Sequence, residues 1–246
     1  IEPHPGGGAS EGSPTSGYLN GLKCLELVLH NGVDPLTGKE VGLKTGDPLK
    51  FTGIEQIMDA LKAQCIHCYD NIMRGYNIVV GYHITYMPTS FSSMVMEGCI
   101  DSGKCTQEGG VKYTNTTTFF CGAASVADSL AAIDTLVFQK HKLTMAQLLD
   151  AMDKNFEGCE DIRQMLINDA PKFGNDIDYV DAFAREIVNY CADYVQQPNH
   201  KDARGGQYCL SNLSETLHVT HGHSTGASAD GRLAGTPLSD NASPSM

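Results

Sequence analysis

Apolar residues recur along much of the chain with the period of an amphipathic helix. Between Ile54 and Ile72 they fall every three or four positions, so we expect a helix whose apolar stripe faces a core. The same period returns from Val126 to Val137 and, over the longest stretch, from Asp178 to Val195. Thr144 and Gln147 have the spacing of a capping box, which predicts the start of a further helix.

Two segments rich in β-branched and aromatic residues predict strands between these helices. They are YNIVVGYHITY, residues 76–86, and VKYTNTTTFF, residues 111–120. A helix that ends at Gly32 is expected near the start of the chain, and a short one within residues 90–104. No internal repeat or linker interrupts the pattern, so residues 1–246 predict a single unit of mixed α/β class.

Composition limits the kinds of partner that the chain can have. Its 246 residues are 41% hydrophobic and 19% charged, which predicts a globular protein with a sizeable core. A net charge of -12 without a run of Lys or Arg argues against binding to nucleic acid or to an acidic membrane. No apolar stretch approaches the roughly 20 residues of a membrane span and no signal peptide is visible, so we expect a cytoplasmic protein.

The nine cysteines raise the question of a metal site. They are scattered through apolar segments, which predicts that most are reduced and buried. The closest pair, Cys65 and Cys68, lies on the apolar stripe of the predicted 54–72 helix, where core packing explains both thiols.

The histidines of HVTHGH, residues 218–223, raise the same question. Alternation along a strand would aim His221 and His223 to one side, as in a set of metal ligands. No acidic partner follows at a suitable spacing, so no bound metal is expected. A Cys/His metal-binding or scaffold domain stays the alternative from a different functional class.

The first and last blocks of the chain carry its most specific motifs. The opening IEPHPGGGASEG resembles the segment after the active cysteine of glycyl radical enzymes of the diol-dehydratase and choline-lyase type, whose signature is Gly-Cys-Val/Ile-Glu-Pro. Further blocks resemble that family in the same order: SFSSMVMEGCIDSGKCTQEGGVKY, APKFGNDIDYVDAFAREI and STGASADGRLAGTPLSDNASPSM. The resemblance implies a ten-stranded α/β barrel, of which this chain supplies a part.

The same resemblance implies that the chain is an internal fragment. The thiyl-forming cysteine is expected directly before Ile1, and the radical glycine, in an Arg-Val-x-Gly-Tyr/Phe motif, beyond Met246. No bound cofactor is implied, because the glycyl radical is a modification of the polypeptide itself. The implied partners are a small-molecule substrate, a radical S-adenosylmethionine activating enzyme and a second copy in a homodimer. The implied location is the cytoplasm or a bacterial microcompartment.

Glu2 is the catalytic base that the resemblance implies. In these enzymes the carboxylate two residues after the cysteine accepts a proton from the substrate hydroxyl, which helps the neighbouring carbon to expel its leaving group. Such a carboxylate must lie within about 3 Å of the proton that it accepts. We therefore expect a glycyl radical lyase that eliminates water or another leaving group next to a hydroxyl-bearing carbon, with Tyr18, Phe119 and His221 as substrate-binding residues.

Two departures from the family pattern bear on the substrate. Relatives that dehydrate small diols share a Gly-Pro-Gln motif, and this chain has TTTFF in its place, with Phe119 where those relatives have the glutamine amide. Those relatives also tend to carry an acidic residue at a position near Thr15 of this chain. Both polar anchors are missing, which weakens an assignment to glycerol or propanediol. Arylacetate decarboxylases, the alternative within the enzyme class, would carry a second glutamate near Phe119, and that is missing too.

Phe119 and Phe120 are neighbours on a predicted strand, so their rings should point to opposite sides. We expect Phe119 to enter the barrel and Phe120 to pack outward. A ring in the pocket removes hydrogen-bonding capacity and fills volume, so the substrate should be less polar, or larger, than glycerol.

Overall fold

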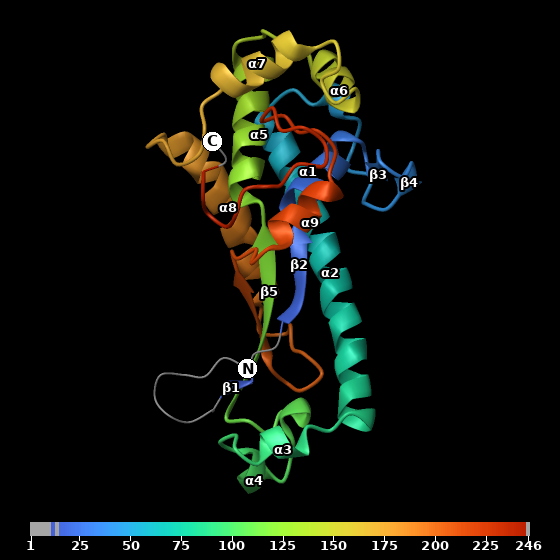
Figure 1. The fold of residues 1–246 in the computed structure, drawn as a ribbon, viewed down its shortest axis with the longest axis vertical. Coiled ribbons are helices and arrows are strands. Elements are labelled where there is room, and N and C mark those ends of the chain that lie inside the picture. The colour runs from blue at the N-terminus through green and yellow to red at the C-terminus, as the bar shows by residue number, and fades with distance from the viewer. Residues whose placement is uncertain (1–10, 13–14, 245–246) are drawn as a thin grey trace. The chain divides into compact units, whose positions relative to one another are not determined.

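A computed structural model describes residues 11–12 and 15–244 of the chain (Figure 1). The strands are β1 Glu11–Gly12, β2 Thr15–Asn20, β3 Val33–Asp34, β4 Lys39–Glu40, β5 Tyr113–Cys121 and β6 Gln207–Ser211. The helices are α1 Gly21–Leu29, α2 Ile54–Tyr86, α3 Ser90–Ser93, α4 Cys99–Ser102, α5 Ala123–Ile133, α6 Met145–Asp153, α7 Glu160–Asn168, α8 Asp178–Val195 and α9 Leu217–His223. Shorter helical turns are η1 Pro48–Lys50, η2 Thr106–Glu108 and the π-helical η3 Asp134–Gln139.

The described residues group into two compact units. The first unit holds the described residues up to Tyr18 together with residues 68–119 and 192–211. The second unit holds residues 19–67, 120–191 and 212–244. The elements β2, α2, β5 and α8 each contribute residues to both units. The expectation of a single unit over residues 1–246 stays a prediction.

The sheet is built around β5, which is hydrogen-bonded to β1, β2 and β6 (Figure 1). The pairing of β5 with β6 is parallel, and it sets Thr116 opposite Tyr208 and Phe119 opposite Ser211. Parallel neighbours need a long connection, and here helices α5 to α8 lie between the two strands in the sequence. This arrangement confirms the predicted strand at residues 111–120 and the α/β class.

Helix α2 differs from the prediction, because residues 76–86 continue the helix that begins at Ile54. The apolar residues of the segment 76–86 do not form a buried run, because Ile78, Tyr82 and Tyr86 are exposed. Val80 of this segment is buried. Each added residue of an existing helix gains a hydrogen bond without a new nucleation step, so elongation outweighs the modest strand preference of these residues.

Other predicted helices are confirmed with small changes. α8 spans Asp178–Val195 as expected, and the side chain of Thr144 with that of Gln147 forms the capping box of α6. Gly32 follows α1 with a positive φ of 85°, and its N–H donates to the carbonyl of Leu27 at 2.7 Å, which ends that helix.

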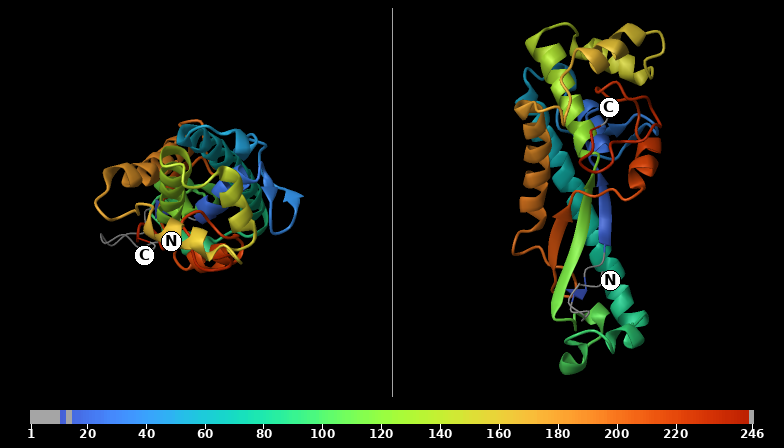
Figure 2. Two further views of the ribbon diagram at one scale, coloured as in Figure 1. Left: turned by 90° about the horizontal axis from the view of Figure 1, so that it is seen from above. Right: turned by 60° about the vertical axis from the view of Figure 1, so that its left-hand side comes forward.

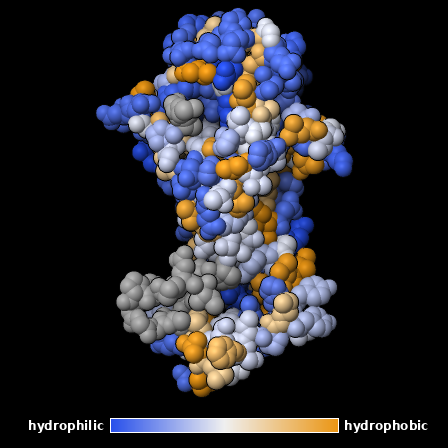
Figure 3. Space-filling model, in the orientation of Figure 1, coloured by the Kyte–Doolittle hydropathy of each residue, from blue (hydrophilic) through white to orange (hydrophobic). Residues whose placement is uncertain are grey.

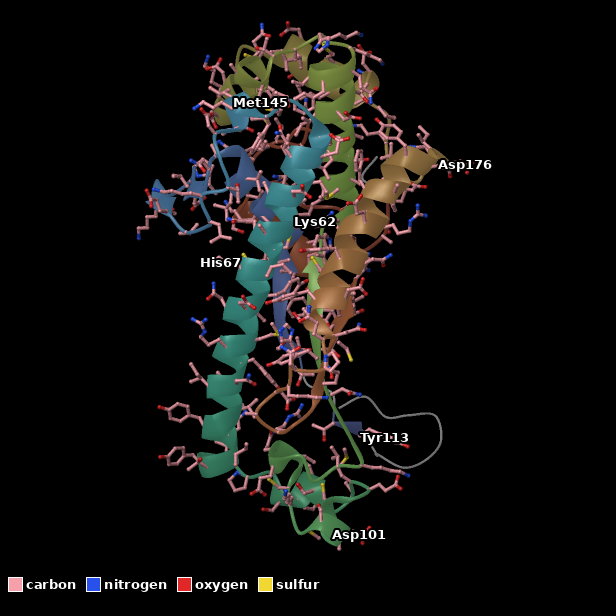
Figure 4. All side chains as sticks on the ribbon, turned by 180° about the vertical axis from the view of Figure 1, so that it is seen from behind. Lys62, His67, Asp101, Tyr113, Met145 and Asp176 are labelled. Carbon is pink, nitrogen blue, oxygen red and sulfur yellow. The ribbon has the colours of Figure 1, made fainter. Side chains whose placement is uncertain are left out.

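The core of the second unit lies among α1, α2 and α5. α1 and α5 pack against each other and remain side by side in both views of Figure 2. Every residue of α5 is buried, and its small side chains allow neighbouring helices to approach closely. On the surface of the same unit, Lys62 of α2 points toward α8 (Figure 4), where its Nζ lies 2.6 Å from Glu186 Oε1 and 5.2 Å from the centre of the Tyr190 ring. Among helices of the described residues, none is long and apolar enough to cross a membrane.

Candidate active-site residues

The expected site residues fall in different parts of the chain. Glu2 lies outside the described residues. Tyr18 on β2 and Phe119 on β5 belong to the first unit, and the structure brings them together. His221 on α9 belongs to the second unit.

Tyr18 and Phe119 form a stacked aromatic pair. Their ring centres are 4.6 Å apart and the ring planes are inclined by only 12°. Phe119 is 7% exposed, whereas Tyr18 is half-buried, so the tyrosine is the more accessible ring of the two. An aromatic pair of this kind contributes on the order of 1 kcal/mol beyond the area that it buries.

Side chains of the residues just before Tyr18 and Phe119 tie the two strands together. Ser16 Oγ donates to the carbonyl of Thr117 at 3.3 Å, and Thr118 Oγ1 donates to the carbonyl of Gly17 at 3.0 Å. Gly17 also lies so close to α2 that a Cβ added there would be 2.9 Å from Ile72 Cγ2. The backbone that carries Tyr18 and Phe119 is therefore held by β2, β5 and α2 together.

Phe120 has different neighbours from Phe119. It is fully buried in the second unit, where a Cβ added to Gly21 would lie 2.5 Å from its Cζ. The adjacent Cys121 is buried as well, and burial raises the pKa of its thiol to about 12. That Phe119 points into a barrel interior, and Phe120 away from it, stays a prediction.

His221 lies on a helix, whereas the alternation considered for residues 218–223 would have required a strand. On a helix, residues two apart face nearly opposite directions, so His221 and His223 do not line one side. His223 is exposed and His221 half-buried. No group of three or more His, Cys, Asp or Glu side chains with the geometry of a metal site occurs within residues 11–12 and 15–244.

The surroundings of His221 favour its neutral form. Burial lowers the pKa of the imidazole, and its Nδ1 is buried without a hydrogen-bond partner among the described residues. The backbone at this residue is firmly held, because its carbonyl accepts from Asn20 Nδ2 at 3.2 Å and from Thr225 Oγ1 at 2.7 Å.

A buried ion pair in the first unit was not anticipated from the sequence. Arg204 Nη2 lies 2.6 Å from Asp202 Oδ2, and the two side chains are only 2% and 0% exposed. The same carboxylate oxygen accepts from Thr116 Oγ1 at 2.5 Å, while its other oxygen accepts from the N–H of Gly206 at 2.8 Å. Arg204 Nη2 also donates to the carbonyl of Asn115, so the network fastens the 202–206 loop to β5.

Electrostatics in this network favour the charged carboxylate. Burial by itself raises the pKa of Asp202, but hydrogen bonds from Thr116 and Arg204 and the arginine charge outweigh burial, so the net pKa is lowered. The only signal in the sequence is an Asp-x-Arg before a strand, which is too common to have indicated a buried pair.

The Asp-Gly-Arg motif near the end of the chain borders a cavity of about 550 Å³ in the second unit. Arg232 of this motif donates to the carbonyls of Leu233 and Thr236 at 2.9 and 2.7 Å. Lys172, also at the cavity, donates to the carbonyl of Asp230 at 3.0 Å. These cations hold the loop in shape, which gives the motif a structural role in this part of the chain.

Comparison with known proteins places these features in a family. The family model described as pyruvate formate lyase-like matches residues 4–222. The chain is 38% identical over 229 residues to trans-4-hydroxy-L-proline dehydratase of Clostridioides difficile, covering 93% of this chain and 29% of that protein. It is 36% identical over 244 residues to isethionate sulfite-lyase of Oleidesulfovibrio alaskensis, covering 94% of this chain and 28% of that one.

Solved structures agree with the sequence comparison. The hydroxyproline dehydratase of C. difficile, crystallised with trans-4-hydroxy-L-proline bound, matches 94% of this chain and 29% of its own with a TM-score of 0.91 and 37% identity. The glycerol-bound form of the B12-independent glycerol dehydratase of Clostridium butyricum matches 96% and 30% with a TM-score of 0.90 and 32% identity. The chain thus spans less than a third of the length of each relative. The resemblance to glycyl radical enzymes and their α/β fold is confirmed, and the chain belongs to the pyruvate formate lyase-like family.

Proposed function

We propose that the polypeptide containing this chain is a glycyl radical lyase that eliminates water or another leaving group next to a hydroxyl-bearing carbon. The observation that carries this proposal is the identity of 38% to a dehydratase and of 36% to a sulfite-lyase, each over more than nine-tenths of the chain. Both names describe the release of a small leaving group. The proposal includes a thiyl-forming cysteine before Ile1, a radical glycine beyond Met246 and activation by a radical S-adenosylmethionine enzyme, which together would supply the hydrogen-atom abstraction.

Glu2 is the proposed general base. Its carboxylate would accept the proton of the substrate hydroxyl, so that negative charge develops on the oxygen beside the carbon that loses its leaving group. A base in this role works best when partial burial brings its pKa toward the working pH.

Tyr18 and Phe119 are the proposed aromatic wall of the substrate pocket. Because Tyr18 is the more accessible ring, we assign contact with the substrate to Tyr18 and assign to Phe119 the support of the Tyr18 ring. A wall of this kind packs against a carbon skeleton and supplies few hydrogen bonds, which favours substrates such as a ring or a longer chain over glycerol.

His221 is proposed as a third substrate-binding residue. Its lowered pKa keeps the imidazole neutral near pH 7, so it could donate one hydrogen bond to a substrate, or accept one, without adding a charge.

The test is turnover by the full-length, anaerobically activated protein. It would be incubated separately with trans-4-hydroxy-L-proline, isethionate, propane-1,2-diol, choline, glycerol and an arylacetate, and loss of each compound would be followed. The proposal expects conversion of at least one hydroxyl-bearing compound that is less polar or larger than glycerol. Stoichiometric zinc in the purified protein without any turnover would instead favour the metal-binding alternative.

A further inference from the structure

We infer that Tyr69 is a positioning residue for the Tyr18–Phe119 pair and thereby for substrate discrimination, an inference that rests on the proposed function of that pair. Tyr69 lies on α2 in the first unit and is fully buried. Its hydroxyl donates to the carbonyl of Phe119 at 3.3 Å.

This hydrogen bond holds β5 at the point where its pairing with β6 ends. The parallel ladder between β5 and β6 runs from Asn115 to Phe119, which pairs with Ser211, the last residue of β6. Phe119 is therefore the last residue of β5 that β6 aligns. At Phe119 the hydroxyl of Tyr69, which lies on α2 outside the sheet, donates a hydrogen bond to the backbone carbonyl.

Because Tyr69 is fully buried, its hydroxyl needs a hydrogen-bond acceptor inside the protein. A phenol removed from water destabilises the fold unless its O–H finds an acceptor, so an apolar ring would be the simpler choice for a purely hydrophobic site. Ile72, three residues further along α2, packs against Gly17 beside Tyr18. Two residues of α2 thus contact the backbone of the stacked pair: Ile72 lies against Gly17, next to Tyr18, and Tyr69 is hydrogen-bonded to Phe119.

The chain offers a matched control. Tyr208 is also a buried tyrosine of the first unit, only 1% exposed, and its hydroxyl donates to the carbonyl of Met73 at 3.3 Å and to Asn77 Oδ1 at 3.1 Å. Tyr208→Phe removes the same atom from the same unit but leaves the bond to Phe119 in place. A general loss of stability would affect both variants, whereas positioning of Phe119 would be lost only in Tyr69→Phe.

The first measurement uses the activated full-length enzyme with trans-4-hydroxy-L-proline as the probe. Tyr69→Phe is expected to raise KM by about fivefold, the equivalent of one neutral hydrogen bond, with kcat changed less than about twofold. Tyr208→Phe should leave KM unchanged. In a Phe119→Leu background, where the supporting ring is gone, adding Tyr69→Phe should change KM no further.

A second measurement does not depend on activity. Hydrogen exchange of the peptide covering residues 117–122 in the full-length protein should be about threefold or more faster in Tyr69→Phe than in Tyr208→Phe, because the end of β5 loses one of its anchors. Equal exchange in the two variants, or a KM change from Tyr69→Phe that is as large in the Phe119→Leu background as in the wild type, would overturn the inference. If the probe is not turned over at all, the exchange result still decides the role of Tyr69, and only the proposed function is then in doubt.

Discussion

Phe119 and Phe120 are adjacent in the sequence, but their rings have different neighbours. Phe119 stacks on a half-buried tyrosine, while its neighbour is fully buried against Gly21. The alternation of strand residues could be predicted from the sequence, whereas the role of Phe119 in a substrate pocket stays a prediction. The stack itself could not be predicted, because no periodicity relates Tyr18 to a residue about a hundred positions away.

The most direct residue-level prediction concerns the base. Glu2→Gln keeps the size of the side chain but removes the proton acceptor, so turnover by the activated full-length enzyme should fall by roughly 100-fold or more. Steady-state kinetics with the best substrate would measure the loss. Normal turnover by the variant would exclude Glu2 as the base.

A second residue-level prediction concerns glycerol. With Phe119 in place of an amide, a small triol lacks a polar anchor, so kcat/KM for glycerol should be at least about tenfold lower than for the best substrate, since one unmatched polar group is worth about 1–3 kcal/mol. Parallel assays of the activated enzyme check this. Efficient glycerol turnover would refute the assignment of the aromatic wall.

At the scale of elements, helix periodicity was a better guide than strand propensity. The stripe on α2 and the full length of α8 followed from spacing alone, whereas residues 76–86 and 218–223 are helical despite β-branched residues. In both cases the neighbouring structure outweighed a weak local preference. The burial of the ion pair of Asp202 and Arg204 depends on contacts with β5, where Thr116 lies 86 residues before Asp202, so it could not be seen in the sequence.

This ion pair predicts a specific response to acid. Because the pKa of Asp202 is lowered on folding, the carboxylate contributes stability above its unfolded pKa of about 3.9, and that contribution is lost as the pH falls through the lower folded pKa. Asp202→Asn leaves Arg204 buried without its counter-ion and should cost about 3–5 kcal/mol at pH 7.

Urea unfolding of the full-length protein between pH 7 and pH 3 would measure the difference in midpoint between wild type and Asp202→Asn. The difference should be constant near neutral pH and shrink below about pH 4. Asp59→Asn serves as the control, since that carboxylate is 80% exposed and should have almost no effect. A difference that is small at pH 7, or that grows in acid, would contradict this account of the pair.

Three helices of the second unit meet at buried thiols, which gives a further prediction. Cys24 of α1, Cys65 of α2 and Cys191 of α8 are each at most 2% exposed. Hydrogen bonds with Cys191 and Cys24, together with burial, raise the pKa of Cys65 well above its usual range, so little thiolate is available to react. Peptide mapping after anaerobic iodoacetamide treatment should find these three unmodified in the native protein and modified in urea. Rapid native labelling of Cys65 would show that this core opens readily.

At the scale of the whole molecule, exposed apolar side chains are consistent with a chain that spans less than a third of its relatives. Phe91, Val95 and Ile100 of the first unit are 83%, 72% and 74% exposed, and apolar atoms gather over α3 and α4 in Figure 3. Contiguous apolar surface usually marks an interface. Sequence motifs identified the family at this scale.

The central claim is that the parent enzyme breaks a bond by elimination, and mass analysis of the product tests it most directly. The activated full-length protein would be incubated with trans-4-hydroxy-L-proline, isethionate and an arylacetate, and the products of any compound consumed would be identified by mass spectrometry. The account predicts a product that has lost water or sulfite while keeping all of its carbon. Release of carbon dioxide from the arylacetate, with no elimination from the hydroxyl-bearing compounds, would contradict it.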